Sequence, residues 1–198
     1  MPIRDVKIPR GYNSKTQKIV GLSAGQLDDQ LNLLIEEVEG LTVKQLEWQY
    51  RPGMNTIGML LAHLAVVDLW WGVIAPKGLS PEPDGDKINL KVIGIRMDDD
   101  GLPLAANGKH PRTLAGKSIT DYLTMLKKAR QAVHKELRTW DDKKLPTRFI
   151  RRRGKKKIEI SHTWVLYHML EHFAGHFGQI LLIMHMLRDA GLLKRPAK

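Results

Sequence analysis

Three histidines recur at four-residue steps in a strongly apolar stretch of the sequence between Tyr167 and Ile180, and they are His168, His172 and His176. Residues four apart on an α-helix lie one above the other on the same face. Imidazole is a preferred ligand of zinc, nickel, copper and iron, so His172 and His176 can hold one ion from one helix face. Histidines on an apolar face also occur as hydrogen-bonded core residues, and the repeat alone does not separate these two interpretations.

The residue types in the chain limit the sites that it can build. Its 198 residues are enough for one domain with a sizeable core. An apolar share of 42% and a charged share of 27% are typical of a soluble globular protein. There is no cysteine, which excludes disulfides, thiolate metal ligands and a cysteine nucleophile. Histidine and carboxylate side chains are therefore the plausible protein ligands for a metal.

Apolar residues at three- and four-residue spacing predict four long helices. We place them at residues 23–40, 56–75, 118–140 and 161–190. Side chains that accept hydrogen bonds from free backbone N–H groups mark their starts, and the predicted N-caps are Ser23, Asn55 or Thr56, Ser118 and Ser161. We find no repeat and no second core. The sequence therefore predicts an all-α fold, with residues 1–198 forming a single four-helix bundle.

The second predicted helix is apolar nearly all round, which is typical of a helix packed on several sides. Its apolar run, residues 58–75, is barely long enough to span a bilayer and carries His63 and Asp68 near its middle, so a buried helix is the better interpretation. An unpartnered His63 would be costly in such a place. Together with His172 and His176 it fits a site with three protein ligands and one open position, the arrangement of catalytic metal centres.

Three segments show no clear period: an irregular lead-in at residues 1–22, a long connection at 76–117 and a tail at 191–198. Long connections are often lids or binding loops. Within this one, residues 88–96 are predicted to form a strand. Residues 98–101 are expected to be a solvated turn, because the spaced ligands of a calcium-binding EF-hand loop are missing. The N-terminal residues lack the apolar core of a signal peptide, which favours a cytoplasmic protein.

Much of the net charge of +11 lies in one short segment, which is predicted to be a β-hairpin just before the last helix. The predicted strands are residues 147–152 and 156–160, with a turn near Gly154. Seven cations with no acid between them make up the cluster, namely Arg148, Arg151, Arg152, Arg153, Lys155, Lys156 and Lys157. Of these, Arg151, Arg152 and Arg153 are candidates for binding an acidic cofactor. Nucleic acid is a less favoured partner, because Phe149 is the only interleaved aromatic residue and no reading motif is present.

Two motifs resemble those of a known family. The stretch Asn55–Leu64, placed after Leu46-Glu47-Trp48 and Pro52-Gly53, resembles the second-helix signature of the DinB-like (YfiT-like) metalloenzymes. The stretch His172–Ile180 resembles that family's last-helix signature, in which a histidine pair precedes a Gly-Gln step. Each motif alone is weak, but their order and separation are also those of the family. The resemblance covers about residues 23–190.

The resemblance implies a four-helix bundle, often dimeric, in which three histidines hold a divalent metal such as zinc or nickel. Carried over by motif, the ligands are His63, His172 and His176. Some relatives transfer a low-molecular-weight thiol such as bacillithiol, mycothiol or glutathione to electrophiles, some are isomerases and some resemble hydrolases. Many relatives have no known reaction, so the resemblance implies a metal-dependent enzyme acting on a small molecule and is compatible with a thiol transferase without selecting it. The chain has no cysteine, so the thiol would come from outside, and the long connection 76–117 departs from shorter relatives and leaves the lid and the substrate open.

Three neighbours of the expected ligands are candidate catalytic residues. Gln179 follows His176 by three positions and could face the open metal position or have a structural role. Glu171 lies about 100° round the helix from the ligand stripe, where a surface or interface position or a role as base is possible. His168 could be a fourth ligand, a hydrogen-bonding partner of a ligand or a core residue.

Other interpretations of the same residues stay open. The chain could be a metal-dependent hydrolase, or a bundle without enzymatic activity that binds a metal or an anion and whose hairpin contacts nucleic acid or an acidic partner. The stretch His168–His172 also spells the H-x-x-E-H motif of inverted zincins, but Asp189 is the only acid downstream that could complete such a site. The isolated His110 and His134 are expected to be solvated.

Overall fold

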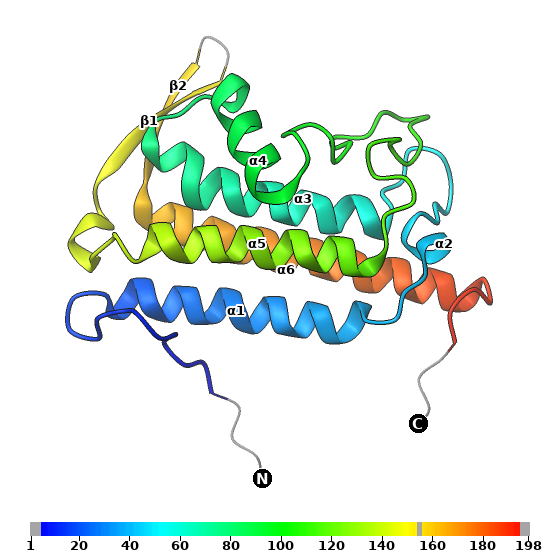
Figure 1. The fold of residues 1–198 in the computed structure, drawn as a ribbon, viewed down its shortest axis with the longest axis horizontal. Helices are drawn as coiled ribbons and strands as arrows, with labels where there is room; N and C mark the ends of the chain where they lie inside the picture. The colour runs from blue at the N-terminus through cyan, green and yellow to red at the C-terminus, as the bar shows by residue number, and fades with distance from the viewer. Residues whose placement is uncertain (1–4, 154–155, 195–198) are drawn as a thin grey trace.

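The computed structural model describes residues 5–153 and 156–194, and its main feature is a bundle of four long helices (Figure 1). Two short helices and a two-stranded antiparallel sheet complete it. The long helices are α1 (Lys18–Val38), α3 (Ile57–Leu69), α5 (Ile119–Leu137) and α6 (His162–Asp189), and the short ones are α2 (Val43–Leu46) and α4 (Asp86–Ile93). The predicted all-helical bundle with a small hairpin is confirmed.

The first helix begins at Lys18, so the prediction that Ser23 is its N-cap was wrong. The carboxylate of Asp142 accepts hydrogen bonds from the backbone N–H groups of Ile19 and Val20, all at 3.1 Å. A side chain distant in sequence therefore satisfies N–H groups that a local cap would otherwise bind. Because this cap comes from the segment after α5, spacing within the first helix could not reveal it.

Helix α3 lies inside the bundle, as its all-round apolar character predicts. Thr56 caps it by accepting from the N–H of Met59, and within the helix only His63 and Val67 are not fully buried. At Gly58 a Cβ atom would lie 2.6 Å from the hydroxyl of Tyr122 on α5, so glycine allows the two helices to approach closely. The chain continues through a π-helical turn, Trp70–Ile74, and a 3₁₀ turn, Ala75–Lys77.

The apolar stretch Ile57–Lys77 is long enough and apolar enough to cross a membrane by length and composition alone. In the structure 83% of its most apolar window is buried inside the protein. A helix covered in this way is the core of the bundle, because its apolar surface is already removed from water by other helices. The interpretation of residues 58–75 as a buried bundle helix agrees with this burial.

The long connection contains a helix where a strand was predicted. Residues 86–93 form α4, which packs on α5 and α3, and Figure 1 shows it lying across α3 next to the hairpin. The prediction of a strand at residues 88–96 was therefore wrong. Asn89 and Ile93 are buried and stand four residues apart, which is the helical rather than the strand period. Gly94 ends the helix with a φ of +79°, a left-handed conformation that glycine adopts without strain.

The hairpin consists of β1 (Arg148–Arg153) and β2 (Lys156–Ser161), close to the predicted strands. In its register Phe149 pairs with Ile160 and Arg151 with Ile158. Ile160 is buried and the guanidinium of Arg151 packs over the rings of Trp70 and Trp71, so this face of the hairpin rests on the bundle. The predicted turn at Gly154 lies outside the described residues.

Candidate metal centre

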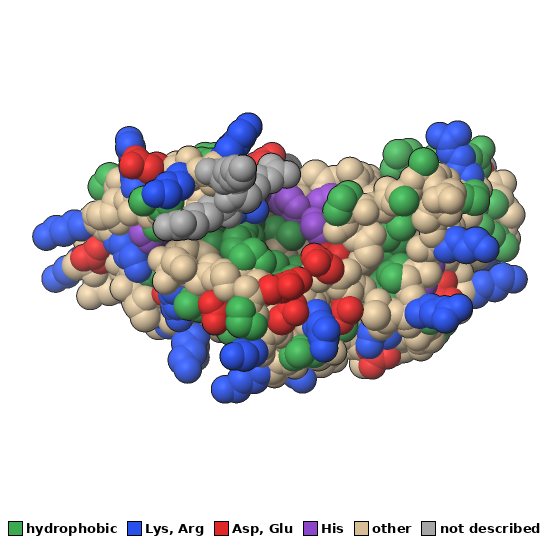
Figure 2. All heavy atoms as spheres, turned by 90° about the horizontal axis from the view of Figure 1, so that it is seen from above, with side chains coloured by type: hydrophobic (Ala, Val, Ile, Leu, Met, Phe, Trp, Pro, Cys, Tyr) green, Lys and Arg blue, Asp and Glu red, His purple; other side chains and the backbone are tan. Residues whose placement is uncertain are grey.

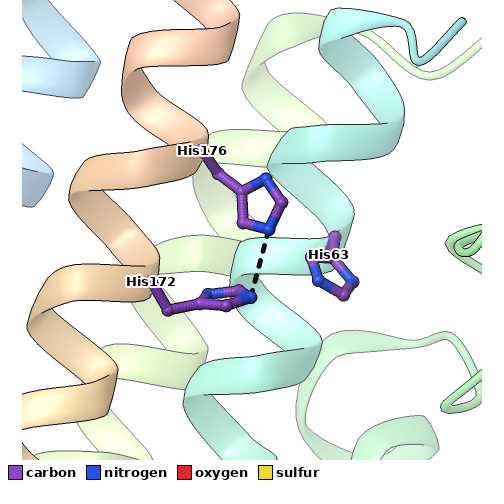
Figure 3. A group of neighbouring side chains, drawn as sticks. All are labelled: His63, His172 and His176. Atoms are coloured by element: carbon purple, nitrogen blue, oxygen red, sulfur yellow. Dashed lines mark hydrogen bonds between the residues drawn. The ribbon is translucent and has the colours of Figure 1, made fainter.

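Three histidines from two helices converge on one side of the bundle. His63 comes from α3, and His172 and His176 come from adjacent turns of α6 (Figure 3). One ring nitrogen of each lies within 4.8 Å of the others, and the ring centroids are 4.4–5.1 Å apart. The structure thus brings together the three residues that the sequence marked as candidate ligands.

The spacing of the α6 pair fits a shared ion. The Nε2 atoms of His172 and His176 lie 3.1 Å apart. Two nitrogens that bind one tetrahedral zinc at 2.0–2.1 Å stand about 3.3 Å apart. This pair therefore needs little rearrangement to bind an ion, because the four-residue step of the helix already sets the distance.

Two hydrogen bonds orient the rings of His63 and His176. The Nδ1–H of His63 donates to Asp100 Oδ2 at 2.8 Å, and the Nδ1–H of His176 donates to Gln179 Oε1 at 2.9 Å. A proton held on Nδ1 leaves the lone pair on Nε2, the atom available to a metal. Partners of this kind also raise the basicity of a ligand and hold its ring in place.

Asp100 is the site residue that sequence reasoning missed. Residues 98–101 were predicted to be a solvated turn, but the side chain of Asp100 is only 3% exposed. Its second oxygen, Oδ1, accepts from the backbone N–H of Leu102 at 2.9 Å. The connection thus folds back onto α3 and places a buried carboxylate against a candidate ligand. The third aspartate of a triplet carries no local signal that distinguishes it from its exposed neighbour Asp98.

Burial favours the neutral form of the imidazoles of the two candidate ligands on α6. Burial, together with the nearby His176, His63 and His168, lowers the pKa of His172 from 6.5 to about 3. Burial also lowers the pKa of His176, although its hydrogen bond to Gln179 acts in the opposite direction. Neutral imidazole is the form that binds metal ions. Three imidazoles without a thiolate, two of them with anchored N–H groups, fit a borderline divalent cation such as zinc or nickel.

The site is open to solvent on one side. All three histidines are partly exposed, and the side chain of His63 is 20% exposed. Figure 2 shows histidine side chains at the surface beside a hollow lined by hydrophobic side chains. Three protein ligands with an approach from solvent leave room for one further ligand, which a structural metal site with four protein ligands does not.

The three candidate catalytic residues on α6, Gln179, Glu171 and His168, each form a side-chain hydrogen bond within the helix. Gln179 holds the ring of His176, as described above. Glu171, half exposed, accepts a hydrogen bond from Nδ1–H of His168 at 2.8 Å. His168 stacks on the indole of Trp164 with ring centroids 4.4 Å apart, and within the described residues it does not belong to the group of converging ligand atoms.

Two histidines expected to be solvated are bonded inside the structure, so that expectation was wrong. His134 donates from Nε2–H to Asp28 at 2.9 Å and accepts from the Tyr12 hydroxyl at 2.8 Å on Nδ1. The Nδ1 atom of His110 lies 2.8 Å from the hydroxyl of Thr56. The His134 ring joins Tyr12 of the N-terminal lead-in to the bundle, and the His110 ring joins the long connection to Thr56 at the start of α3. The spacing of apolar residues along the helices does not predict such contacts.

The basic candidates belong to strand β1 of the hairpin. Arg151 stacks over Trp71 and Trp70, with its guanidinium carbon 4.9 and 5.4 Å from the two ring centroids. The side chains of Arg152 and Arg153 lie outside the described part of the chain. Arg148 forms an exposed ion pair with Glu159 at 3.2 Å.

Comparison with known proteins identifies the family of the chain. The family model described as the DinB superfamily matches residues 26–180. A conserved protein from Enterococcus faecalis has a similar crystal structure, with a TM-score of 0.58 and 15% identity over 83% of this chain and 94% of that one. A DinB-like protein from Bacillus cereus ATCC 10987 has a TM-score of 0.51 and 20% identity over 88% and 96% of the two chains. At such identities these structures show the fold alone, and no curated protein matches the sequence.

The family match spans most of the chain and includes all three converging histidines, so this chain belongs to the DinB superfamily.

Proposed function

We propose that this protein is a divalent-metal-dependent enzyme that transfers an external low-molecular-weight thiol to a small electrophilic molecule. The observation that carries the proposal is the convergence of His63, His172 and His176, with the N–H groups of two rings held by Asp100 and Gln179. Such an arrangement can hold an ion while one side stays open to solvent. The absence of cysteine means that a thiol nucleophile has to come from outside the chain.

A divalent cation bound by these histidines would lower the pKa of a thiol or water that binds next to them, and so supply a nucleophile near neutral pH. The protein's own part is to hold and orient the ligands. Asp100 fixes His63 from the connection, and Gln179 fixes His176 from one turn further along α6. In this proposal Gln179 is a positioning residue.

The pair His168–Glu171 is the proposed acceptor for the proton that an incoming thiol loses. The ring centroid of His168 lies 5.6 Å from that of His172, one turn away on α6. The imidazole is partly exposed, at 20%, and its Nδ1–H is held by Glu171. A histidine in this position can exchange protons with solvent and with a ligand that enters from the same side.

Elemental analysis of the purified protein tests metal binding. We expect about one equivalent of zinc or nickel in the wild type and loss of the metal in His63→Ala, His172→Ala and His176→Ala. His185→Ala is the matched control, since His185 is an exposed histidine on the same helix. Circular dichroism spectra that match the wild type show that the variants still fold. Equal metal content in all five proteins would contradict the proposed ligands.

A panel of thiols tests the reaction. The wild type is incubated with bacillithiol, mycothiol or glutathione and the electrophile 1-chloro-2,4-dinitrobenzene, before and after removal of metal by a chelator. Transfer that stops with the chelator and returns with added metal supports the proposal. Metal binding without transfer of any thiol would overturn the transferase assignment. Thiol-independent cleavage of a p-nitrophenyl ester would instead favour a hydrolase.

We further propose that the protein acts as a homodimer in the cytoplasm, where low-molecular-weight thiols are kept reduced. Exposed apolar side chains on α1 and α6 support a dimer, since Leu22 is 42%, Tyr167 63% and Leu182 55% exposed. Among the described residues, no side chain and no backbone from another segment lies within 4 Å of a Cβ placed on Gly175 or Gly178 of α6. Light scattering of the wild type and of Leu182→Lys tests this, and a wild type that stays monomeric at high concentration would contradict it.

A further inference from the structure

A cavity of about 820 Å³ lies between the hairpin and the first turn of α6, away from the three histidines. Its size is that of a pocket for a small molecule. Arg148, Arg151, Ile158, Ile160 and Trp164 are among the residues that line it. We propose that this cavity binds the body of the electrophilic substrate, an aromatic molecule that bears a carboxylate or a similar anion. The assignment as substrate pocket rests on the proposed function.

The walls of the cavity suit a flat apolar body. Trp164 is 39% and Ile158 43% exposed, so both present apolar surface to a ligand in the cavity. The indole of Trp164 is held in place by stacking on His168, with an angle of 18° between the rings, and by an edge contact with Trp71 at 5.1 Å. A fixed indole is a good stacking surface for a planar ligand, because little side-chain entropy is lost on binding.

The charge at the cavity selects an anion. Among the described side chains of the hairpin the cations are Arg148, Arg151, Lys156 and Lys157, and the one acid is Glu159. The guanidinium of Arg151 is oriented by the rings of Trp70 and Trp71, and a guanidinium binds carboxylates in its own plane. The ion pair between Arg148 and Glu159 is exposed on both sides, at 67% and 63%, and such pairs contribute little free energy. Arg148 can therefore exchange Glu159 for a ligand at small cost.

The cavity and the histidines lie on one path along α6. Trp164 precedes His172 by two helical turns, about 12 Å. His168 stands between them, stacked on Trp164 and 5.6 Å from His172 between ring centroids. A substrate of about this length can place its anionic aromatic end at the hairpin and its reactive end at the histidines.

Binding of 2-naphthoate, an aromatic carboxylate, to the full zinc-loaded protein tests the cavity by isothermal titration calorimetry. We expect binding to the wild type, and binding at least about fivefold weaker for Trp164→Ala and for Arg148→Gln, because each variant loses one contact of moderate strength. Tyr167→Ala is the matched control, since Tyr167 is exposed on the same helix and does not line the cavity. The neutral analogue 2-naphthalenemethanol should bind at least about fivefold more weakly than naphthoate. No naphthoate binding, or equal binding by Trp164→Ala, Arg148→Gln and wild type, would overturn the proposal.

The variant His172→Ala separates this cavity from the metal. If naphthoate binds at the cavity, its affinity stays within about twofold of the wild type when the histidine is removed, because the contacts that hold it are elsewhere. Loss of naphthoate binding in His172→Ala would show that the carboxylate binds at the histidines, and the cavity assignment would fail. The wild type could instead bind naphthoate through Trp164 and Arg148 and take up no metal. That result would overturn the proposed metal-dependent function, but the cavity would remain an anion-binding pocket.

Discussion

Asp100 accepts a hydrogen bond from Nδ1–H of His63 at 2.8 Å, across 37 positions of sequence. The aspartate belongs to the long connection and the histidine to the central helix α3. Because the carboxylate is almost fully buried, this contact fixes the ring of His63 from outside the bundle. The connection is therefore part of the candidate metal centre, through a residue that the helices themselves do not supply.

Asp100→Ala should weaken zinc binding by about 10- to 100-fold, because the imidazole of His63 loses the partner that holds its tautomer and orientation. Competition with a chromophoric zinc chelator measures the affinity. Asp98→Ala, which removes an exposed aspartate of the same turn, should bind zinc as the wild type does. Equal affinities for the two variants would show that the His63–Asp100 contact does not support the metal.

Gln179→Ala should weaken zinc binding less than Asp100→Ala. The amide oxygen of Gln179 holds Nδ1–H of His176 from an exposed position, where water can take its place. We expect a loss of roughly threefold to tenfold, below the 10- to 100-fold that is typical for partners of metal ligands. The same chelator competition measures the zinc affinity. Gln26→Ala is the control, since Gln26 is a glutamine on α1, a helix that carries none of the three histidines. A loss larger than that of Asp100→Ala would mean that Gln179 contacts the metal or its open position directly.

The stability of the metal-free protein should fall as the pH is lowered from about 6.5 toward 3. In the folded state the pKa of His172 is lowered to about 3 and that of His176 is also lowered, mainly by burial. The unfolded chain takes up protons on these rings below about pH 6.5, so it binds more protons than the folded chain in this window. Urea midpoints in the presence of a chelator at pH 7.5, 6 and 5 measure the slope. His172→Gln should show a shallower slope, and an unchanged slope would contradict the assigned pKa shift.

Asp68→Leu should destabilise the fold strongly without acting on the metal centre. Asp68 on α3 accepts two hydrogen bonds from Arg130 on α5, at 3.0 and 2.8 Å, and each of these side chains is about 95% buried. Loss of the aspartate leaves a buried guanidinium without its main partner, at a cost of about 3–5 kcal/mol. Urea unfolding measures it. The double variant Asp68→Leu with Arg130→Met should recover most of the loss, and a double variant as unstable as the single one would show that the charge is not the cause.

The sequence determined the parts of this protein whose signals are local. The i, i+4 step that brings His172 beside His176 is a property of any α-helix, so the pair could be recognised without a structure. The same holds for the N-caps Thr56, Ser118 and Ser161, whose side chains bond backbone groups three residues ahead. The all-round apolar character of α3 also predicted that it is buried in the bundle.

Only the tertiary structure decided which distant groups meet. Asp142 caps α1, Asp100 holds His63, and His134 joins Tyr12 to Asp28, yet each of these contacts spans more than 30 positions of sequence. Residues 88–96 were predicted to be a strand because a short apolar run is compatible with both helix and strand spacing. In the structure, residues 86–93 form a helix that packs on α5 and α3. Backbone geometry repeats along the chain and can be read from spacing. The choice of a partner for a buried polar group depends on which segments pack together, and that is set by the whole core.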